Sequence, residues 1–170
     1  MIERVESAGG ESVMSDLIEI VRDSVASGAS VGFLPPLAEG EARAYWQGVL
    51  ADVAEGKRVL LVARKGGRAV GTVQIELPSK PNARHRAEVQ KLLVHTSARR
   101  QGLGRALLAA IEAEALALGR LLLVLDTRQG DSAEPLYHSH GYTRAGEIPH
   151  YARNGDGGLD ATVIFYRWLG

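Results

Sequence analysis

The spacing of hydrophobic residues predicts helices and strands along the whole chain. Apolar side chains recur with helical periodicity over Ser12–Ser27, from about Glu39 to Glu55 and over Leu103–Leu118, which is typical of amphipathic helices. A glycine follows each of these segments, as is common where a helix ends. A shorter helix is expected from Ser132 to about His140, with a proline that its first turn tolerates.

Other segments have the patterns of strands. They are Ile2–Val5, Arg58–Arg64, Ala69–Leu77, Arg86–Val94, Leu121–Leu125, Tyr142–Ile148 and Thr162–Trp168. Gly66-Gly67 supplies the positive φ of a tight hairpin, so the second and third strands are expected to be antiparallel. The continuous apolar run Leu121–Leu125 predicts a strand buried on both faces. Together these elements predict one α/β domain over residues 1–170.

The helix over Leu103–Leu118 is the most strongly predicted helix of the chain. Its apolar face is expected to carry Leu103, Leu107, Ile111 and Leu118, with Arg105, Ala109 and Glu112 on the opposite face. Glu114 falls on the apolar side and does not fit the pattern.

Composition and charge limit the classes of function. Of 170 residues, 45% are hydrophobic and 24% are charged, which predicts a folded globular chain. Twenty basic residues balance twenty acidic ones, so no net field favours nucleic acid or a membrane as partner. The absence of cysteine and of any long apolar run predicts a cytoplasmic protein without disulfides or a membrane anchor. The oligomeric state is left open, a homodimer included.

A glycine loop carries the first functional signal. Arg99–Arg105 lies between a predicted strand and the strongest predicted helix, so free amides at the helix start point into the loop. These amides, the positive end of the helix dipole and the flanking arginines favour a phosphate, although a helix-capping turn is the plain alternative. The loop lacks the Gly-Lys-Ser/Thr ending of a P-loop and the third glycine of a dinucleotide site.

This loop and a later motif resemble the GNAT acetyltransferases. Arg99 to Gly104 matches the family's Arg/Gln-x-x-Gly-x-Gly/Ala pattern, and Ala133 to Tyr142 matches its Ala-x-x-Leu-Tyr-x-x-x-Gly-Tyr pattern about thirty residues later. The resemblance implies a mixed, mostly antiparallel and splayed sheet with helices on both faces, and acetyl-coenzyme A as co-substrate. It implies that the coenzyme pyrophosphate is held by Arg99, Arg100, Gln101, Gly102, Leu103, Gly104 and Arg105.

Further segments resemble the tabtoxin-resistance acetyltransferases and their relatives. These segments are Ser27–Phe33, Lys80–Asn82, Arg86–Leu92, Leu125–Thr127 and Tyr142–Pro149. The similarity covers nearly the whole chain and implies a small, amino-acid-like acceptor. Substrate identity transfers between relatives less safely than the fold.

The resemblance also implies contacts to the pantetheine arm of the coenzyme. Backbone amides of Leu92, Leu93 and Val94 are expected to bind it where two central strands diverge. Many relatives have an asparagine shortly before the second motif, where this chain has Gln129 and Gly130, so Ser132 is the candidate to replace that contact.

Three side chains are candidates for the chemistry of acetyl transfer. In the family, the tyrosine matched by Tyr137 is the general acid for the departing thiolate, and a carboxylate at the place of Glu88 acts as base. Asp126 follows the Leu121–Leu125 strand and is expected to attract the amine or to share the base role. The alternatives are a packed aromatic ring and solvated or arginine-paired carboxylates. No metal site is expected, because His138 and His140 stand two apart on one helix.

Three hypotheses for the function follow. The first is an N-acetyltransferase that acts on a primary amine of a small amino-acid-like or antibiotic-like molecule. The second is a protein N-terminal or lysine acetyltransferase, and the third is a non-catalytic sensor of acyl-coenzyme A. The acid and base candidates favour an enzyme, because a sensor needs neither.

Overall fold

A seven-stranded sheet flanked by helices forms the fold in the computed structural model, which describes residues 1–6 and 9–170. The strands are β1 (Ile2–Arg4), β2 (Arg58–Lys65), β3 (Arg68–Glu76), β4 (Arg86–Val94), β5 (Leu122–Arg128), β6 (Thr143–Arg153) and β7 (Leu159–Trp168). The α-helices are α1 (Gly10–Ala26), α2 (Glu39–Ala54), α3 (Leu103–Ala117) and α4 (Glu134–Ser139), with short 3-10 helices η2 (Pro81–Ala83) and η3 (Thr96–Ala98). The predicted elements are confirmed, with shifted ends.

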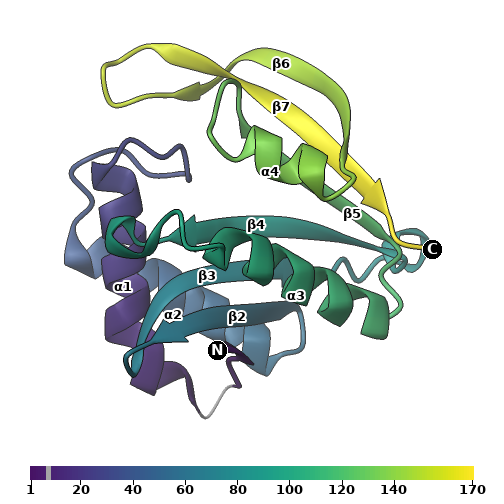
Figure 1. Cartoon of the computed structure of the whole chain (residues 1–170), viewed down its shortest axis with the longest axis horizontal. Coiled ribbons are helices and arrows are strands. Elements are labelled where there is room, and N and C mark those ends of the chain that lie inside the picture. Colours follow the sequence, from purple (N-terminus) through teal and green to yellow (C-terminus); the bar gives the residue numbers. More distant parts are fainter. Residues whose placement is uncertain (7–8) are drawn as a thin grey trace.

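The sheet is splayed between its fourth and fifth strands. The strand order is β1-β2-β3-β4-β5-β7-β6, and every neighbouring pair is antiparallel except β4 and β5. These two parallel strands pair only over Arg86–Glu88 and Leu122–Val124. Beyond that they diverge, as the V between β4 and β5 in Figure 1 shows. The mixed, splayed sheet expected from the family resemblance is therefore confirmed.

Each face of the sheet packs against its own pair of helices. Leu60 and Val62 of β2 pack with the buried side chains of α1 and α2, among them Trp46. Val59 and Leu61 of the same strand belong to the cluster on the other face. That cluster contains Leu107, Leu108 and Ile111 from α3, Tyr137 from α4 and Phe165 from β7. The alternation along β2 thus fills two separate hydrophobic layers.

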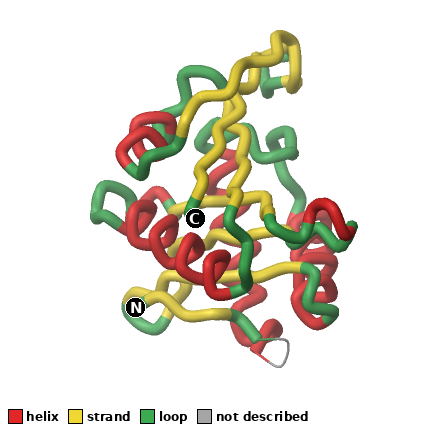
Figure 2. Tube along the Cα trace, turned by 90° about the vertical axis from the view of Figure 1, so that its right-hand side faces the viewer, coloured by secondary structure: helices red, strands yellow, loops and turns green. Residues whose placement is uncertain are grey.

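The hairpin of β6 and β7 is longer than the sequence predicts. It was expected to end at Ile148 and resume at Thr162, but it continues to Arg153 and resumes at Leu159. Pro149 falls where the register shifts between Ile148 and Ala152, and His150 there has φ 54°. The ladder is interrupted at this irregularity, so the missing N–H of the proline breaks no strand pairing and the strand continues past it. Figure 2 shows the hairpin rising away from the other strands.

The prediction that β5 is buried on both faces is wrong. Leu123 and Leu125 are buried in the cluster beneath α3, whereas Leu122 and Val124 are only partly buried. Their face of the strand borders the opening that β4 leaves as it diverges. The apolar run therefore covers one packed face and one wall of a pocket.

The predicted faces of α3 also need correction. Glu112 was placed on the polar face, yet it is only 9% exposed. Its Oε2 accepts a hydrogen bond of 2.7 Å from Arg167 on β7 and lies 3.5 Å from His140 Nδ1. Leu118, assigned to the apolar face, is 43% exposed because α3 ends at Ala117. Glu114 is accommodated by an ion pair of 3.0 Å with Arg4.

Replacing Glu112 with Ala is expected to lower the free energy of unfolding by roughly 1.5–3 kcal/mol, the range for a hydrogen bond to a charged group. The loss arises because Arg167 keeps its charge without its carboxylate partner. Urea denaturation measures the change. Glu114→Ala is the control, because its ion pair is more exposed and is expected to contribute about 1 kcal/mol or less. Equal stability of Glu112→Ala and the parent protein would contradict the structural role.

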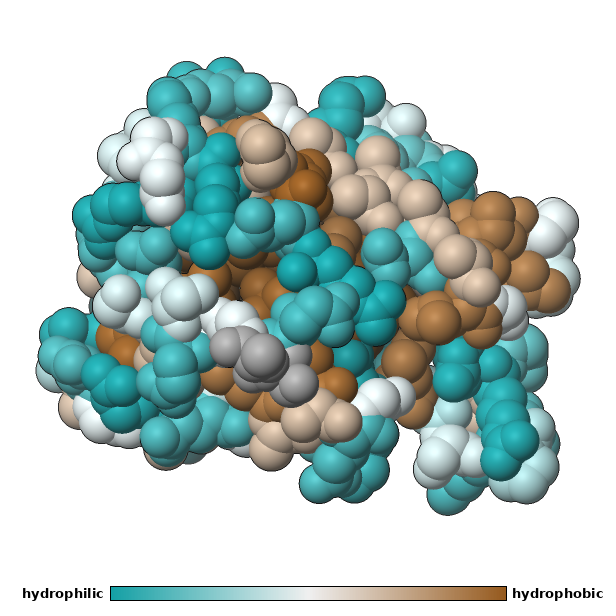
Figure 3. Space-filling model, turned by 90° about the horizontal axis from the view of Figure 1, so that it is seen from below, coloured by the Kyte–Doolittle hydropathy of each residue, from teal (hydrophilic) through white to brown (hydrophobic). Residues whose placement is uncertain are grey.

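The surface of the molecule carries both hydrophilic and large hydrophobic side chains. Exposed large hydrophobic side chains include Leu116 and Leu118 at the end of α3 and Trp168 at the end of β7. Figure 3 shows mostly hydrophilic side chains on the face seen from below, with hydrophobic ones gathered toward one side. Among the described residues, no helix has the length and hydrophobicity required to span a membrane.

Candidate active site

The glycine loop before α3 presents a row of free backbone amides. Arg100 has φ 59° and Gly102 has φ 79°, and Gly102 is the N-cap of α3 without any side-chain cap. Within residues 1–6 and 9–170, no acceptor is hydrogen-bonded to the amides of residues 100–105. Free amides on alternating backbone conformations form a concave binding site for an anion, and the dipole of α3 reinforces it. The loop therefore has the geometry of a phosphate cradle.

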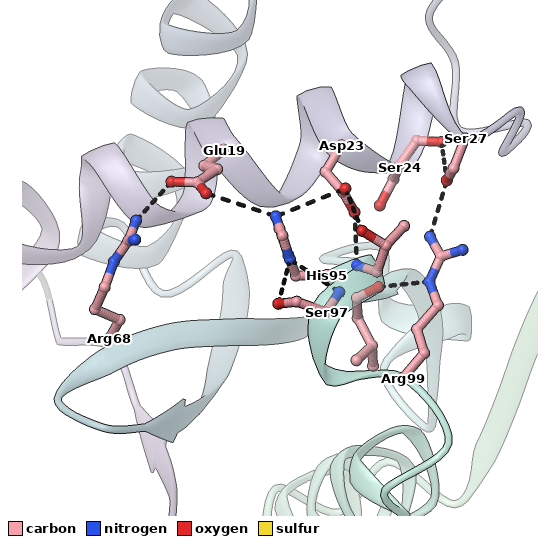
Figure 4. A network of polar contacts seen from close by, with 10 residues as sticks. Glu19, Asp23, Ser24, Ser27, Arg68, His95, Ser97 and Arg99 are labelled. Carbon is pink, nitrogen blue, oxygen red and sulfur yellow. Dashed lines mark hydrogen bonds and ion pairs between the residues drawn. The ribbon is translucent and has the colours of Figure 1, made fainter.

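Arg99 anchors this loop to the rest of the protein. Its Nε donates to the Val94 carbonyl at 2.9 Å, and another guanidinium nitrogen donates to Ser27 Oγ at 2.9 Å (Figure 4). Ser27 lies at the end of α1, so the guanidinium joins that helix to the end of β4. A contact between Arg99 and the coenzyme stays a prediction, and the observed role of its side chain is to position the loop.

A cluster of charged residues holds the start of the same loop. Asp23 of α1 accepts hydrogen bonds from the Thr96 amide at 2.8 Å and the Thr96 hydroxyl at 2.7 Å. His95 Nε2 lies 3.5 Å from Glu19 and 3.6 Å from Asp23, as Figure 4 shows. These contacts fix η3 against α1 and so determine where the following amides point.

The other side chains of the loop remain at the surface. Lys65 donates to Gln101 Oε1 at 2.7 Å, and Arg105 donates to Ser139 Oγ at 3.3 Å. The Arg100 side chain is exposed. Leu103 and Gly104 are the first residues of α3, and a Cβ at Gly104 would meet Leu136 at 3.6 Å. The loop residues predicted to bind the cofactor thus lie together around the free amides.

Strand β4 carries a bulge next to the opening of the sheet. The register with β3 shifts between Thr72 and Gln74, and Lys91 opposite that shift has φ 50°. The segment Leu92–Val94 follows the bulge, after the last residue of β4 that pairs with β5. Its outer edge therefore has no strand beside it, which agrees with the expected role of these amides. Binding of a pantetheine arm there stays a prediction.

The two candidate carboxylates meet in one pocket. Glu88 and Asp126 line a cavity of about 170 Å³ on the face of the sheet that α1 and α2 cover, with Val124, Leu125, Ile148, Tyr151, Thr162 and Ile164. Asp126 accepts a hydrogen bond of 2.8 Å from Thr162, and Glu88 accepts one of 3.1 Å from Gln90. Among the described residues, neither carboxylate forms an ion pair. The arginine-paired alternative is therefore not what the structure contains.

Tyr137 lies on the opposite face of the sheet. Its side chain is 7% exposed and packs in the layer beneath α3 and α4, with ring centroids 5.8 Å from Tyr142 and 5.7 Å from Phe165. Burial, and then the charges of Asp131 and Asp126, raise the pKa of the Tyr137 phenol. The phenol is protonated at neutral pH, as an ordinary tyrosine also is, and burial makes it release its proton less readily.

Several residues that position this tyrosine and the acidic pocket were not predicted from the sequence. Asp131 Oδ1 accepts from the Ala133 amide at 2.8 Å, and Glu134 Oε1 accepts from the Gly130 amide at 2.6 Å. The spacing Asp-x-x-Glu before a short helix is a capping signal that would have identified them. Ser132 is exposed between them, and its coenzyme contact stays a prediction. For Lys91 and Thr162, in contrast, no local sequence pattern indicates a place at the site.

The histidines in and directly after α4, His138 and His140, pack against identified neighbours. The rings of His138 and Phe165 are 5.2 Å apart, and His140 adjoins Glu112. In the described part of the chain, no three His, Asp or Glu side chains gather where they would hold a metal ion.

The comparisons with known proteins agree with this arrangement. The family model described as an acetyltransferase (GNAT) domain matches residues 56–144. An N-acetyltransferase of Azospirillum brasilense, encoded between hisH and hisA, is 36% identical over 124 residues, covering 72% of each chain. Among solved structures, an N-acetyltransferase from Staphylococcus aureus has a TM-score of 0.83 at 18% identity and covers 100% of this chain and 98% of its own. The yncA protein of Salmonella typhimurium, solved with its cofactor acetyl-CoA, has a TM-score of 0.79 at 21% identity, covering 100% and 94%. The chain belongs to the GNAT family of N-acetyltransferases.

Proposed function

We propose that the protein transfers an acetyl group from acetyl-coenzyme A to the primary amine of a small, amino-acid-like molecule in the cytoplasm. The observation that carries the proposal is the opening between β4 and β5, which has a row of free amides at its end and an acidic pocket on one face. A buried tyrosine lies on the other face. A donor thioester within this opening would have a base on one side and an acid on the other.

The donor half of the site suits coenzyme A. The amides of residues 100–105 and the α3 dipole would bind the pyrophosphate, with Arg100 at the surface beside it. The open edge of Leu92–Val94 would bind the pantetheine amides and place the thioester at the bulge of β4. This division leaves the pocket of Glu88 and Asp126 for the acceptor.

The transfer itself requires three proton movements. An amine is mostly protonated at neutral pH, so Glu88 or Asp126 first attracts the ammonium group and then accepts its proton, directly or through a water. The amine nitrogen then forms a bond to the carbonyl carbon, and the bond between that carbon and sulfur breaks. Tyr137 donates its proton to the departing thiolate, and the acylated nitrogen then gives its second proton to the Tyr137 phenolate, which restores the phenol. The products are an amide and free coenzyme A.

The walls of the acceptor pocket favour a small molecule over a protein. Ile148 and Tyr151 from the β6–β7 hairpin line the pocket. The tip of that hairpin meets the segment between α1 and α2, because a Cβ at Gly155 would lie 2.9 Å from Pro35 Cγ. A cavity of about 170 Å³ lined by these hairpin side chains suits a compact amine better than an extended peptide.

A panel of amines tests the proposal. The protein is incubated with acetyl-coenzyme A and amino acids, polyamines, aminoglycosides or peptides, and free thiol release is followed while mass spectrometry identifies the acetylated product. We expect a compact amine to give the largest kcat/KM. Exclusive acetylation of peptides would favour the protein-acceptor alternative, and coenzyme binding without any product would favour the sensor.

Replacing Gly102 with Val is expected to weaken acetyl-coenzyme A binding at least tenfold. Gly102 has φ 79°, which a β-branched residue rarely adopts, and open space surrounds the position of its missing Cβ. Val therefore both shifts the loop amides and projects into the space that a phosphate would occupy. Calorimetry measures the dissociation constant. Gly56→Val, after α2, is the control, because its φ of 69° carries a comparable penalty at the end of β2 opposite to the contact between Lys65 and Gln101. Unchanged affinity in a folded Gly102→Val protein would remove the phosphate assignment.

A further inference from the structure

Lys91 is a partly buried cation without a counterion. It sits at the bulge of β4, three residues after Glu88, and its side chain extends toward α2 and the segment between α1 and α2. Its Nζ lies 5.3 Å from the centroid of the Tyr45 ring and 3.9 Å from the position that a Cβ at Gly32 would take. Within residues 1–6 and 9–170, no carboxylate forms an ion pair with Lys91 and no acceptor is hydrogen-bonded to it.

The aromatic residue beneath this ammonium is held in place by polar contacts. The Tyr45 hydroxyl accepts a hydrogen bond of 2.6 Å from Gln74, and its ring packs edge to face against Phe33. Arg58 donates to both Gln74 at 3.2 Å and Gln90 at 2.8 Å. Gln90 in turn donates to Glu88, so one network joins the base candidate to the platform under Lys91. The ammonium is thus positioned relative to the acidic pocket.

The surroundings of Lys91 make its charge costly in the free protein. Burial, and then the neighbouring Arg58, lower the pKa of the Lys91 ammonium, while the charges of Asp126 and Glu88 oppose the shift. A buried cation without a partner is unfavourable, whereas an anion brought to it restores the interaction that burial removed. A cation with this environment beside a substrate pocket is typical of a binding residue.

We propose that Lys91 binds an oxyanion of the acceptor, such as a carboxylate, so that the acceptor carries one amine and one acidic group. The inference rests on the proposed function and deepens it. Lys91 lies three strand residues from Glu88, a separation of roughly 10 Å along the backbone. The Glu88 and Lys91 side chains shorten this gap, so the two ends suit a zwitterion whose charged groups are several bonds apart, with its ammonium at Glu88 and Asp126 and its oxyanion at Lys91. Polyamines are disfavoured because Lys91 repels a second cationic group.

Matched acceptors test the anion site. Free amino acids and their carboxamides differ only in the acidic group, so the ratio of their kcat/KM values reports on its recognition. In the parent protein, we expect the acid to be preferred by roughly 10- to 100-fold, the range for a charge-assisted hydrogen bond. Lys91→Met is expected to bring this ratio close to one with little change for the carboxamide. Lys91→Arg is expected to retain the preference, and Lys57→Met, an exposed lysine that does not line the pocket, is the control.

Three outcomes would overturn the inference. One is an unchanged acid preference in Lys91→Met, another is a preference of the parent protein for carboxamides, and the third is acetylation of Lys91 itself by acetyl-coenzyme A, detected by mass spectrometry. A competition experiment in the parent protein does not depend on how the variant folds. Propionate is expected to compete with the amine substrate, and propionamide is not. If acids and their carboxamides are acetylated equally well, the anion site at Lys91 is wrong but the proposed acetyltransferase function still holds. If no amine is acetylated, the proposed function fails with it.

Discussion

Replacing Tyr137 with Phe is expected to lower kcat by roughly 10²- to 10⁴-fold, the usual contribution of a general acid, with little change in the KM for acetyl-coenzyme A. The substitution keeps the ring, which packs between Tyr142 and Phe165, and removes only the hydroxyl. Burial raises the pKa of this hydroxyl above its ordinary value of 10.0, so it is protonated throughout the neutral and mildly alkaline range.

Steady-state kinetics at saturating amine measure the effect of this substitution. Tyr142→Phe is the matched control, because its buried hydroxyl has no hydrogen-bond partner among the described residues. That variant is expected to retain nearly full turnover. If Tyr137→Phe turns over at the parent rate, Tyr137 is a packing residue and the thiolate takes its proton from solvent.

Glu88→Gln and Asp126→Asn are expected to separate the two roles of the acidic pocket. Loss of the base at Glu88 should lower kcat by roughly 10²- to 10⁴-fold. Loss of the charge at Asp126, which Thr162 holds at 2.8 Å, should chiefly raise the KM for the amine because an electrostatic anchor disappears. Both substitutions preserve the shape of the side chain, so the pocket keeps its volume.

Initial rates over a range of amine concentrations distinguish these effects. Glu76→Gln is the control, because Glu76 is the cross-strand partner of Glu88 and shares Gln90 with it but does not line the pocket. Its kinetic constants are expected to stay close to those of the parent protein. If neither pocket carboxylate affects any kinetic constant, proton removal must fall to solvent or to a water held by backbone groups.

The sequence predicted most elements because their signals are local. The glycine pair between β2 and β3 adopts φ 58° and 82°, as a tight hairpin requires. Strand β4 was placed at its observed bounds, since alternating residues and a glycine loop delimit it. The family model covers residues 56–144, and both the glycine loop and the second motif lie inside that range.

Features that depend on distant partners could not be predicted. Glu112 is buried because Arg167, far along the chain, supplies its countercharge. The bulge at Lys91 arises from the register between β4 and β3, and the sequence of β4 contains no local signal that predicts it. The meeting of Glu88 and Asp126 likewise depends on the parallel pairing of β4 and β5. Each of these arrangements is a property of the sheet and not of a local pattern.

The contact between the hairpin tip and the α1–α2 segment has a consequence for how this protein can diverge from its relatives. Gly155 and Pro35 meet there, and both lie outside residues 56–144, the part that matches the family model. The donor loop, the bulge and Tyr137 all lie inside it. The pocket walls that come from the β6–β7 hairpin, such as Ile148 and Tyr151, can therefore change while the glycine loop and Tyr137 stay unaltered, so two members with the same motif can present different pockets.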